Sequence, residues 1–202
     1  MLERPKDDVV IDIETCGTKQ DSIIVSIGAV IFNRADAPGT IIDKIEFKLD
    51  IVNQNNRVAY PDTMLWWMKD SMREARMKTF FSADPKLRLG LALKNLDDFI
   101  KKYDLGECWG CGPDFDMRIL EHAYDQHGRP FPMPFWTWRC IRTIESFFYG
   151  KNTRKDGGEN WAGGTAHDAV DDCIMEAKVI QNCYSVLQKV AKLQESFKKV
   201  ST

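Results

Sequence analysis

Two carboxylates near the start of the chain, Asp12 and Glu14, alternate with isoleucines in a run of β-branched residues. Successive side chains of a β-strand point to opposite faces, so both carboxylates lie on one face of an otherwise apolar strand. Like charges at this spacing repel each other and resist burial unless a cation pairs with them, which points to a divalent metal ion. The alternative is that the strand ends at Asp12 and both groups reach solvent in a turn.

Further acidic groups stand at the predicted starts of two helices. Asp116 lies in the first turn of one helix, on the same stripe as apolar residues. His167 opens the sequence His-Asp-Ala-Val-Asp-Asp, where a glycine-rich segment meets the last helix. Acidic residues are common in first turns because they interact well with the helix dipole, so each group alone has a structural explanation. Helical periodicity does not choose among Asp168, Asp171 and Asp172.

Strands and helices of a mixed α/β domain position these groups. Three strands joined by turns predict an antiparallel meander. A fourth strand leads through a Gly-Pro-Asp turn, with Asp114 as the expected N-cap, into a helix, which is half of a βαβ unit. The strands are expected at residues 9–13, 22–32, 41–49 and 107–110, and the helices at 62–81, 86–102, 114–126, about 141–148 and 165 to nearly the C-terminus. We expect one domain over residues 1–202, with a helix-rich insertion at about 50–85 and a mobile loop at 151–164.

The order and spacing of three motifs are more specific than any one of them. They are Ile-Asp-Ile-Glu-Thr, then Trp-Gly-Cys-Gly-Pro-Asp-Phe-Asp-Met-Arg-Ile-Leu, then His-Asp-Ala-Val-Asp-Asp. In this order they resemble the three motifs of the DEDDh family of 3′→5′ exonucleases, over about residues 9–184. The resemblance implies an RNase H-like α/β fold, whose mixed five-stranded sheet combines an antiparallel meander with parallel strands and is flanked by helices. The second motif and the insertion sequence Pro-Asp-Thr-Met-Leu-Trp-Trp-Met-Lys-Asp are most similar to the DexA-like and exodeoxyribonuclease VIII-like subgroup.

Carried over to this chain, the family pattern implies a catalytic and metal-binding set. Asp12 and Glu14 match the first motif, Asp116 the second, and His167 with Asp172 the third, where the five-residue spacing selects Asp172. The four negative charges of these carboxylates balance the charge of two divalent cations. Oxygen ligands without a thiolate favour Mg²⁺, with Mn²⁺ able to replace it. In such a site, ions about 3.5–4 Å apart clamp the phosphoryl group. We expect Asp12 to bridge the ions, Glu14 and Asp172 to complete the water-activating site, and Asp116 to serve the other ion. His167, with a reference pKa of about 6.5, is the expected general base and swings in when substrate binds.

Substrate binding is expected at two places. The backbone of Thr15 and Cys16, next to the metals, could meet the terminal nucleotide, as the family implies. Trp66 and Trp67 of the insertion could stack on a base, a contact worth about 1–3 kcal/mol that tolerates any sequence. Adjacent helix positions lie about 100° apart, so the two rings are not expected to have the same role, and the alternative is that at least one belongs to the core.

The charge distribution limits how a nucleic acid could be held. The 202 residues are 44% hydrophobic and 29% charged, with a formal net charge of −2, which argues against a protein that coats DNA with a uniformly positive surface. Basic residues concentrate at residues 69–88 and 139–155. Such runs are commonly solvated faces, but beside an anionic metal site they could follow a single-stranded backbone.

Six cysteines are spread through a chain with no secretory signal and no apolar run long enough to cross a membrane. We therefore expect a soluble, cytoplasmic protein with reduced thiols and no membrane partner. Cys108 and Cys111 form a single C-x-x-C pair without a second pair, so a zinc or redox site is a weak alternative. The long last helix could support a homodimer or could belong to the core.

The sequence thus predicts a metal-dependent 3′→5′ exonuclease that hydrolyses single-stranded DNA from its 3′ end and releases nucleoside 5′-monophosphates. The alternative is an exoribonuclease that trims RNA 3′ ends, because nothing in the motifs reads the 2′-hydroxyl. A third interpretation is a non-catalytic nucleic-acid-binding module on the same fold. Such a module would tolerate loss of a carboxylate, whereas all five expected positions are filled.

Overall fold

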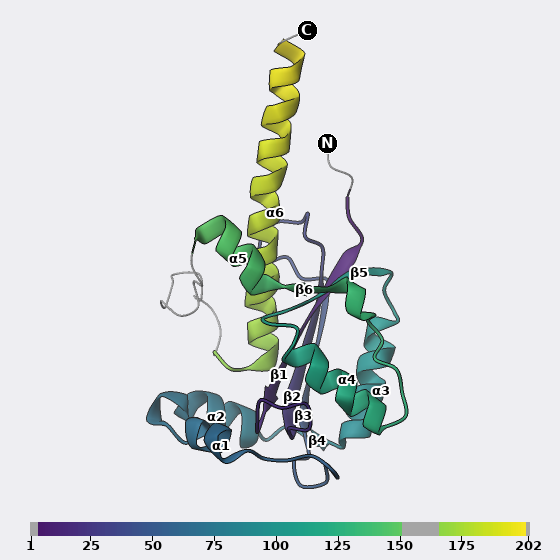
Figure 1. Ribbon diagram of the computed structural model, residues 1–202, viewed down its shortest axis with the longest axis vertical. Helices are drawn as coiled ribbons and strands as arrows, with labels where there is room; N and C mark the ends of the chain where they lie inside the picture. Colours follow the sequence, from purple (N-terminus) through teal and green to yellow (C-terminus); the bar gives the residue numbers. More distant parts are fainter. Residues whose placement is uncertain (1–3, 151–165, 201–202) are drawn as a thin grey trace.

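A six-stranded mixed sheet forms the centre of the protein in the computed structural model, which describes residues 4–150 and 166–200 (Figure 1). The strand order is β4-β3-β2-β1-β5-β6, in which β1, β2 and β3 form an antiparallel meander and β5 and β6 run parallel to β1. This confirms the predicted fold class. The strands are β1 (Asp7–Thr15), β2 (Ile24–Phe32), β3 (Asp43–Leu49), β4 (Lys86–Leu87), β5 (Leu105–Gly110) and β6 (Trp138–Cys140).

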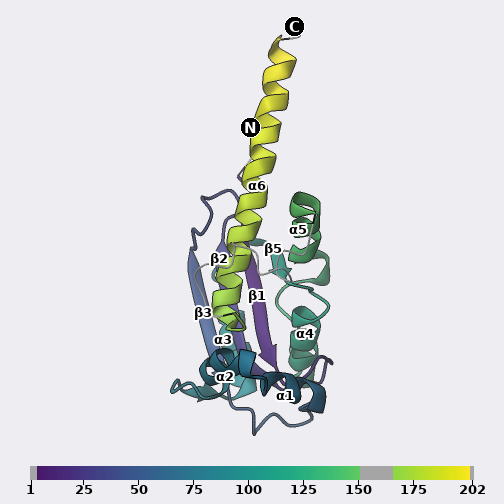
Figure 2. The same cartoon turned by 90° about the vertical axis from the view of Figure 1, so that its left-hand side faces the viewer.

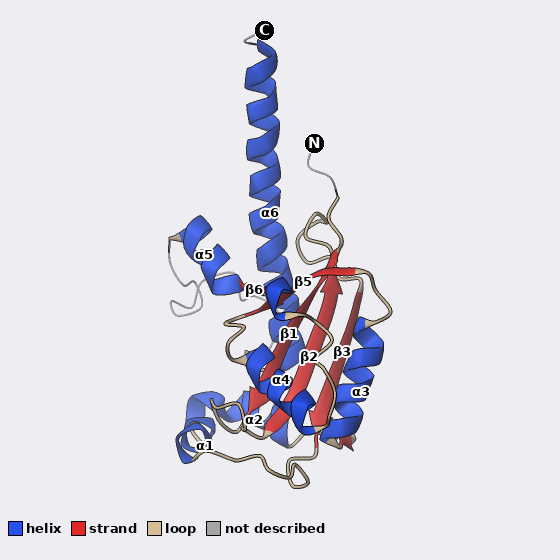
Figure 3. Ribbon diagram, turned by 45° about the vertical axis from the view of Figure 1, so that its right-hand side comes forward, coloured by secondary structure: helices blue, strands red, loops and turns tan. Residues whose placement is uncertain are grey.

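Helices cover both faces of the sheet. In Figure 2, α6 lies across β1, β2 and β3, whereas Figure 3 shows α3 and α4 on the opposite face. The α-helices are α1 (Pro61–Trp67), α2 (Arg73–Phe80), α3 (Leu89–Ile100), α4 (Asp116–Gln126), α5 (Ile141–Tyr149) and α6 (Ala169–Val200), and two 3₁₀ turns are η1 (Asp70–Met72) and η2 (Phe135–Thr137). No helix in the described part of the chain combines the length and the apolar character needed to span a membrane.

Strand β1 divides the core into two layers. Its odd-numbered residues, Ile11 and Ile13 among them, pack with the apolar side chains of α3 and α4. Val10 belongs to the other layer, with Cys173 and Ala177 of α6. Because side chains alternate along a strand, the even-numbered carboxylates of β1 must face α6.

Helix α6 approaches the sheet closely because β2 carries a glycine at the contact. A Cβ atom at Gly28 would lie 2.4 Å from the backbone carbonyl carbon of Ala169 and 2.6 Å from the backbone nitrogen of Val170. Gly28 is also the residue of β2 that pairs with Asp12 of β1. The missing side chain therefore brings the first turn of α6 down onto the strand next to the predicted metal ligand.

The last helix begins at Ala169 instead of residue 165, and two other predicted helices differ from the structure because other segments contact them. The segment expected as one helix at 62–81 is divided into α1, η1 and α2, because Lys69 is extended and Arg76 of α2 donates hydrogen bonds to the carbonyls of Trp67 and Lys69. The helix expected from residue 86 begins at Leu89, because Lys86 and Leu87 pair with β3 instead. The sheet thus has six strands instead of the five that the resemblance implies, and both β4 and β6 lie outside the strand ranges predicted from the sequence.

The two halves of α6 have different surroundings. Its first three turns bury Cys173, Ala177 and Ile180 against the sheet. Its second half extends beyond the rest of the molecule and exposes Val186 and Leu193, among other apolar residues (Figure 1). The homodimer suggested by this helix stays a prediction. The loop expected at 151–164 lies outside the described residues.

Candidate active site

Asp12 and Glu14 lie on the face of β1 that is covered by α6, as the strand periodicity predicts. Glu14 is buried and Asp12 is partly buried. The strand continues to Thr15, so the alternative in which it ends at Asp12 is wrong. Both carboxylates are therefore held in a sheet below a helix instead of in a solvent-exposed turn.

The third motif meets Glu14 at the first turn of α6. The backbone N–H of His167 donates to Oδ2 of Asp172 over 3.1 Å. Potential ligand atoms of Glu14, His167 and Asp172 all lie within 4.8 Å of one another. His167 has a φ of +64°, in the left-handed region that residues other than glycine rarely adopt. The ring predicted to swing in on substrate binding already stands beside the carboxylates in this structure.

Asp116 reaches the site from the start of α4. It is 2% exposed, and its Oδ1 accepts a hydrogen bond of 3.3 Å from the backbone N–H of Ile13, between the two carboxylates of β1. Asp114 was expected to cap this helix, but the N-cap is Phe115 and no side chain caps the helix. Asp116 therefore begins the helix with its carboxylate turned to β1.

The carboxylates of this cluster raise one another's pKa. Burial is the largest cause of the raised pKa of Asp12, Glu14 and Asp116. The pKa of Asp12 and of Glu14 lies well above the usual range, with Asp116 and Asp172 adding to both shifts. Burial and the charge of Glu176 raise the pKa of Asp116 to about 8. Bringing so many carboxylates together without cations is unfavourable, whereas divalent ions would neutralise them. The donor set, all hard oxygens with one imidazole, fits such ions.

Glu176 is a fifth acid of the cluster and is not among the residues that the sequence motifs select. It is completely buried on α6, and its charge raises the pKa of both Asp12 and Asp116. Residues four apart share a helix face, so the spacing from Asp172 is the signal that could have indicated it. Because the helix carries several acidic residues, the four-residue spacing identifies Glu176 only once Asp172 is known to face the sheet.

An ion-pair network fixes the turn that carries the third motif. Buried Lys48 of β3 lies 3.1 Å from Asp168, whose carboxylate accepts a hydrogen bond from the N–H of Asp171 and so caps α6. Lys78 of α2 binds both aspartates, at 3.3 Å from Asp168 and 2.6 Å from Asp171. Asp168 and Asp171 thus position the helix, which leaves Asp172 for the metal site, as the spacing of the family motif implies.

The insertion also contacts His167 directly. Thr79 of α2 is buried, and its hydroxyl donates to the backbone carbonyl of His167 over 3.2 Å. The ring of Trp66 meets the imidazole edge-on, with the ring centroids 5.0 Å apart. The insertion therefore holds the expected general base from two sides.

Trp66 and Trp67 have different environments, as their helical spacing predicts. Trp67 is 1% exposed, and its indole N–H donates to the carbonyl of Thr15 over 2.9 Å. It anchors the insertion to the end of β1 and presents no open ring face to a base. Trp66 is only partly buried and lies next to His167. Of the two rings, Trp66 is therefore the one for which base stacking stays a prediction.

Thr15 and Cys16 lie at the end of β1, but much of their backbone is already bonded within the protein. The N–H of Cys16 donates to Ile23 and its carbonyl accepts from Tyr60. The Cys16 side chain is buried, which raises the pKa of its thiol to about 11. None of the six cysteines forms a disulfide, and Cys108 and Cys111 are both buried.

Comparison with known proteins agrees with this geometry. A family model described as the 3'-5' exoribonuclease Rv2179c-like domain matches residues 7–184. The chain belongs to this family. It is therefore a 3′→5′ exonuclease of the DEDDh type, and all five motif residues fall within the matched range. No curated protein sequence matches the chain.

Solved structures of exonucleases have the same fold. The nuclease domain of 3'hExo, a DEDDh family member bound to rAMP, superposes with a TM-score of 0.62 at 16% identity, covering 89% of this chain and 92% of that one. Cell-death related nuclease 4 gives 0.57 at 15% identity, covering 90% and 64%. E. coli exonuclease I in complex with a dA16 oligonucleotide gives 0.59 at 15% identity, covering 91% of this chain but 42% of that chain. At these identities the likeness establishes the RNase H-like fold.

Proposed function

We propose that this exonuclease removes nucleoside 5′-monophosphates from the 3′ end of single-stranded nucleic acid, with two Mg²⁺ ions held by Asp12, Glu14, Asp116 and Asp172. The observation that carries the proposal is that ligand atoms of Glu14, His167 and Asp172 lie within 4.8 Å of one another. The buried carboxylates of Asp116 and Glu176 belong to the same cluster. When bound, the ions supply an activated water and stabilise the charge on the leaving 3′-oxygen.

His167 is the proposed general base, which accepts the proton of the attacking water on a ring nitrogen. Its ring is held by Trp66 and its backbone by Thr79 and Asp172, so the nitrogen is oriented toward the carboxylates before substrate arrives. Proton transfer by a positioned side chain typically contributes about 10²–10⁴-fold. His167→Ala should therefore lower kcat by about that factor, while Mg²⁺ binding measured by calorimetry is retained. Near-normal turnover in this variant would remove the role.

RNA is the substrate that we propose first, because the family to which the chain belongs is named for exoribonuclease activity. Single-stranded DNA, which the sequence analysis favours, is the second candidate, supported by the shared fold of exonuclease I bound to dA16 and dT13 oligonucleotides. We also propose that the chain belongs to the DexA-like and exodeoxyribonuclease VIII-like subgroup, on the sequence of its insertion.

The substrate test uses end-labelled RNA and DNA strands of one sequence, incubated with the protein and Mg²⁺. Release of mononucleotides from RNA alone supports the exoribonuclease, and release from DNA alone overturns that choice. Parallel reactions contain a chelator, or the Asp12→Ala variant in place of the wild type. Neither reaction should release mononucleotides. Activity that survives both would refute the metal mechanism, whichever strand is cleaved.

A further inference from the structure

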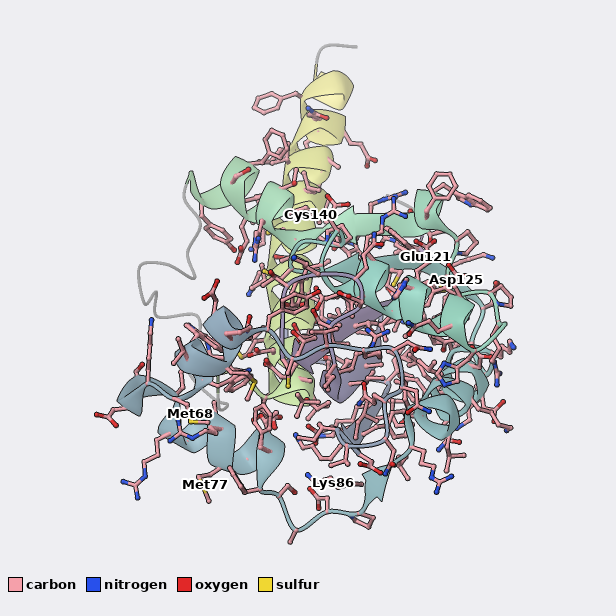
Figure 4. The ribbon with its side chains drawn as sticks, turned by 60° about the horizontal axis from the view of Figure 1, so that its bottom comes forward. Met68, Met77, Lys86, Glu121, Asp125 and Cys140 are labelled. Carbon is pink, nitrogen blue, oxygen red and sulfur yellow. The ribbon has the colours of Figure 1, made fainter. Side chains whose placement is uncertain are left out.

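Arg142, near the start of α5, contacts the segment that leads from β5 to Asp116, and the proposed mechanism gives it no role. Helix α5 begins directly after β6, at the point marked by the labelled Cys140 in Figure 4. The Nε–H of Arg142 donates to the thiol sulfur of Cys111 over 3.2 Å. Cys111 follows β5 and lies five residues before Asp116, so this contact fixes the guanidinium next to the second motif.

The guanidinium lies over Gly112. A Cβ atom at this glycine would be 3.3 Å from Nη1 and 3.6 Å from Cζ of Arg142. Gly112 has a φ of +106°, and its carbonyl accepts from the N–H of Phe115 in the turn that leads into α4. A side chain at this position would strain the backbone and crowd the guanidinium, so the turn both presents Asp116 and leaves room for Arg142.

Among the described residues, no carboxylate forms an ion pair with Arg142, and its side chain is exposed. Lys48, which also lies near the cluster, is buried and bound to Glu46 and Asp168. Arg139, in the same basic segment as Arg142, is paired with Glu107 at 2.8 Å. Both contacts of the guanidinium, Cys111 and Gly112, lie in the segment that leads from β5 to Asp116.

We propose that Arg142 binds a phosphate of the substrate at the cleavage site, with Nη1 and Nη2 as donors while Nε is held by Cys111. A planar guanidinium matches two phosphate oxygens, and hydrogen bonds of this charged kind are stronger than neutral ones. The inference rests on the proposed function, since it needs a phosphodiester at the carboxylate cluster. It adds an anion-binding group to a site that consists otherwise of carboxylates and the imidazole of His167.

The test compares two ligands that differ only in the phosphate. Binding of AMP and of adenosine is measured by calorimetry in Mg²⁺ for the wild type, Arg142→Ala and Arg142→Lys. We expect Arg142→Ala to weaken AMP binding by about 10- to 100-fold and to leave adenosine unchanged. Arg142→Lys should recover only part of the loss, because an ammonium lacks the planar pair of donors. The kcat/KM on the oligonucleotide should fall by a similar factor.

Arg118 provides a matched control. It is an exposed arginine of α4, two residues after Asp116, but it pairs with Glu121 at 2.7 Å and stacks on Trp138 away from the cluster. Arg118→Ala should bind AMP like the wild type. An equal loss in both arginine variants, unchanged AMP binding in Arg142→Ala, or a parallel loss of AMP and adenosine binding with a lower Tm would each overturn the proposal. A wild type that releases no mononucleotide from either strand would instead refute the proposed function.

Discussion

Replacing Asp116 by asparagine should stabilise the metal-free protein while it abolishes catalysis. Burial and neighbouring charge raise the pKa of this carboxyl from 3.8 to about 8. A carboxyl with a raised pKa in the folded state opposes folding once the unfolded chain has lost its proton. Stability therefore falls as the pH rises from about 4 to about 8. At about 1.4 kcal/mol per pH unit, the full shift corresponds to about 6 kcal/mol.

Asparagine has nearly the same shape and no charge. Its side-chain oxygen can still accept the hydrogen bond from the N–H of Ile13, so the start of α4 keeps its contact with β1. Burial and mutual repulsion also raise the pKa of Asp12 and Glu14, so part of the unfavourable electrostatic free energy remains after the substitution. With about 2–4 °C per kcal/mol for a chain of this size, we expect Tm to rise by about 5–10 °C at pH 8.

The assay is thermal unfolding in a chelator between pH 5 and pH 8, repeated with Mg²⁺. The advantage of Asp116→Asn should shrink as the pH falls. Mg²⁺ should raise the Tm of the wild type much more than that of the variant. Asp98→Asn, which removes an exposed carboxylate paired with Lys94, should change Tm by no more than about 1 °C. A lower Tm for Asp116→Asn at pH 8 in the chelator, or a difference independent of pH, would refute the reasoning.

Three further variants test the elements that hold the site. Gly28→Ala should lower Tm and kcat together, because its methyl group would displace the backbone of α6 at Ala169, and a normal melting curve would contradict this close packing. Thr79→Val should lower kcat about 10-fold at nearly constant Tm, with recovery in Thr79→Ser, because the Thr79 hydroxyl, and not its methyl group, holds the backbone carbonyl of His167. Trp66→Ala should raise KM for oligonucleotides by about 10-fold, and an unchanged KM would show that its ring does not stack on a base.

The sequence predicts the part of the site that follows from local periodicity. Alternation along β1 places Asp12 and Glu14 on one face, and the structure places them there because Ile11 and Ile13 pack into the core on the other face. No local periodicity in the sequence predicts the break between α1 and α2. It depends on Arg76, which satisfies carbonyls that are nine and seven residues away.

Local sequence patterns also do not predict contacts between distant segments of the chain. The two-residue strand β4 exists only because β3 offers a partner, and Glu176 joins the cluster only because the packing of α6 turns it toward β1. The network of Lys48 and Lys78 with Asp168 connects β3, α2 and α6, which are far apart in the chain. In the sequence, such residues look like any other charged residues. Their roles can be recognised only when the fold brings them together.

The docking of α6 on the sheet makes catalysis a reporter of partial unfolding. The first turns of this helix carry Asp172 and Glu176, and His167 directly precedes them, whereas Asp12 and Asp116 belong to other elements. Sub-global openings that release a single helix require less free energy than complete unfolding. When α6 detaches, the site loses its base and two of its acids in one step, while most of the sheet stays paired. Hydrolysis in mild denaturant should therefore cease before the β-sheet signal in circular dichroism changes.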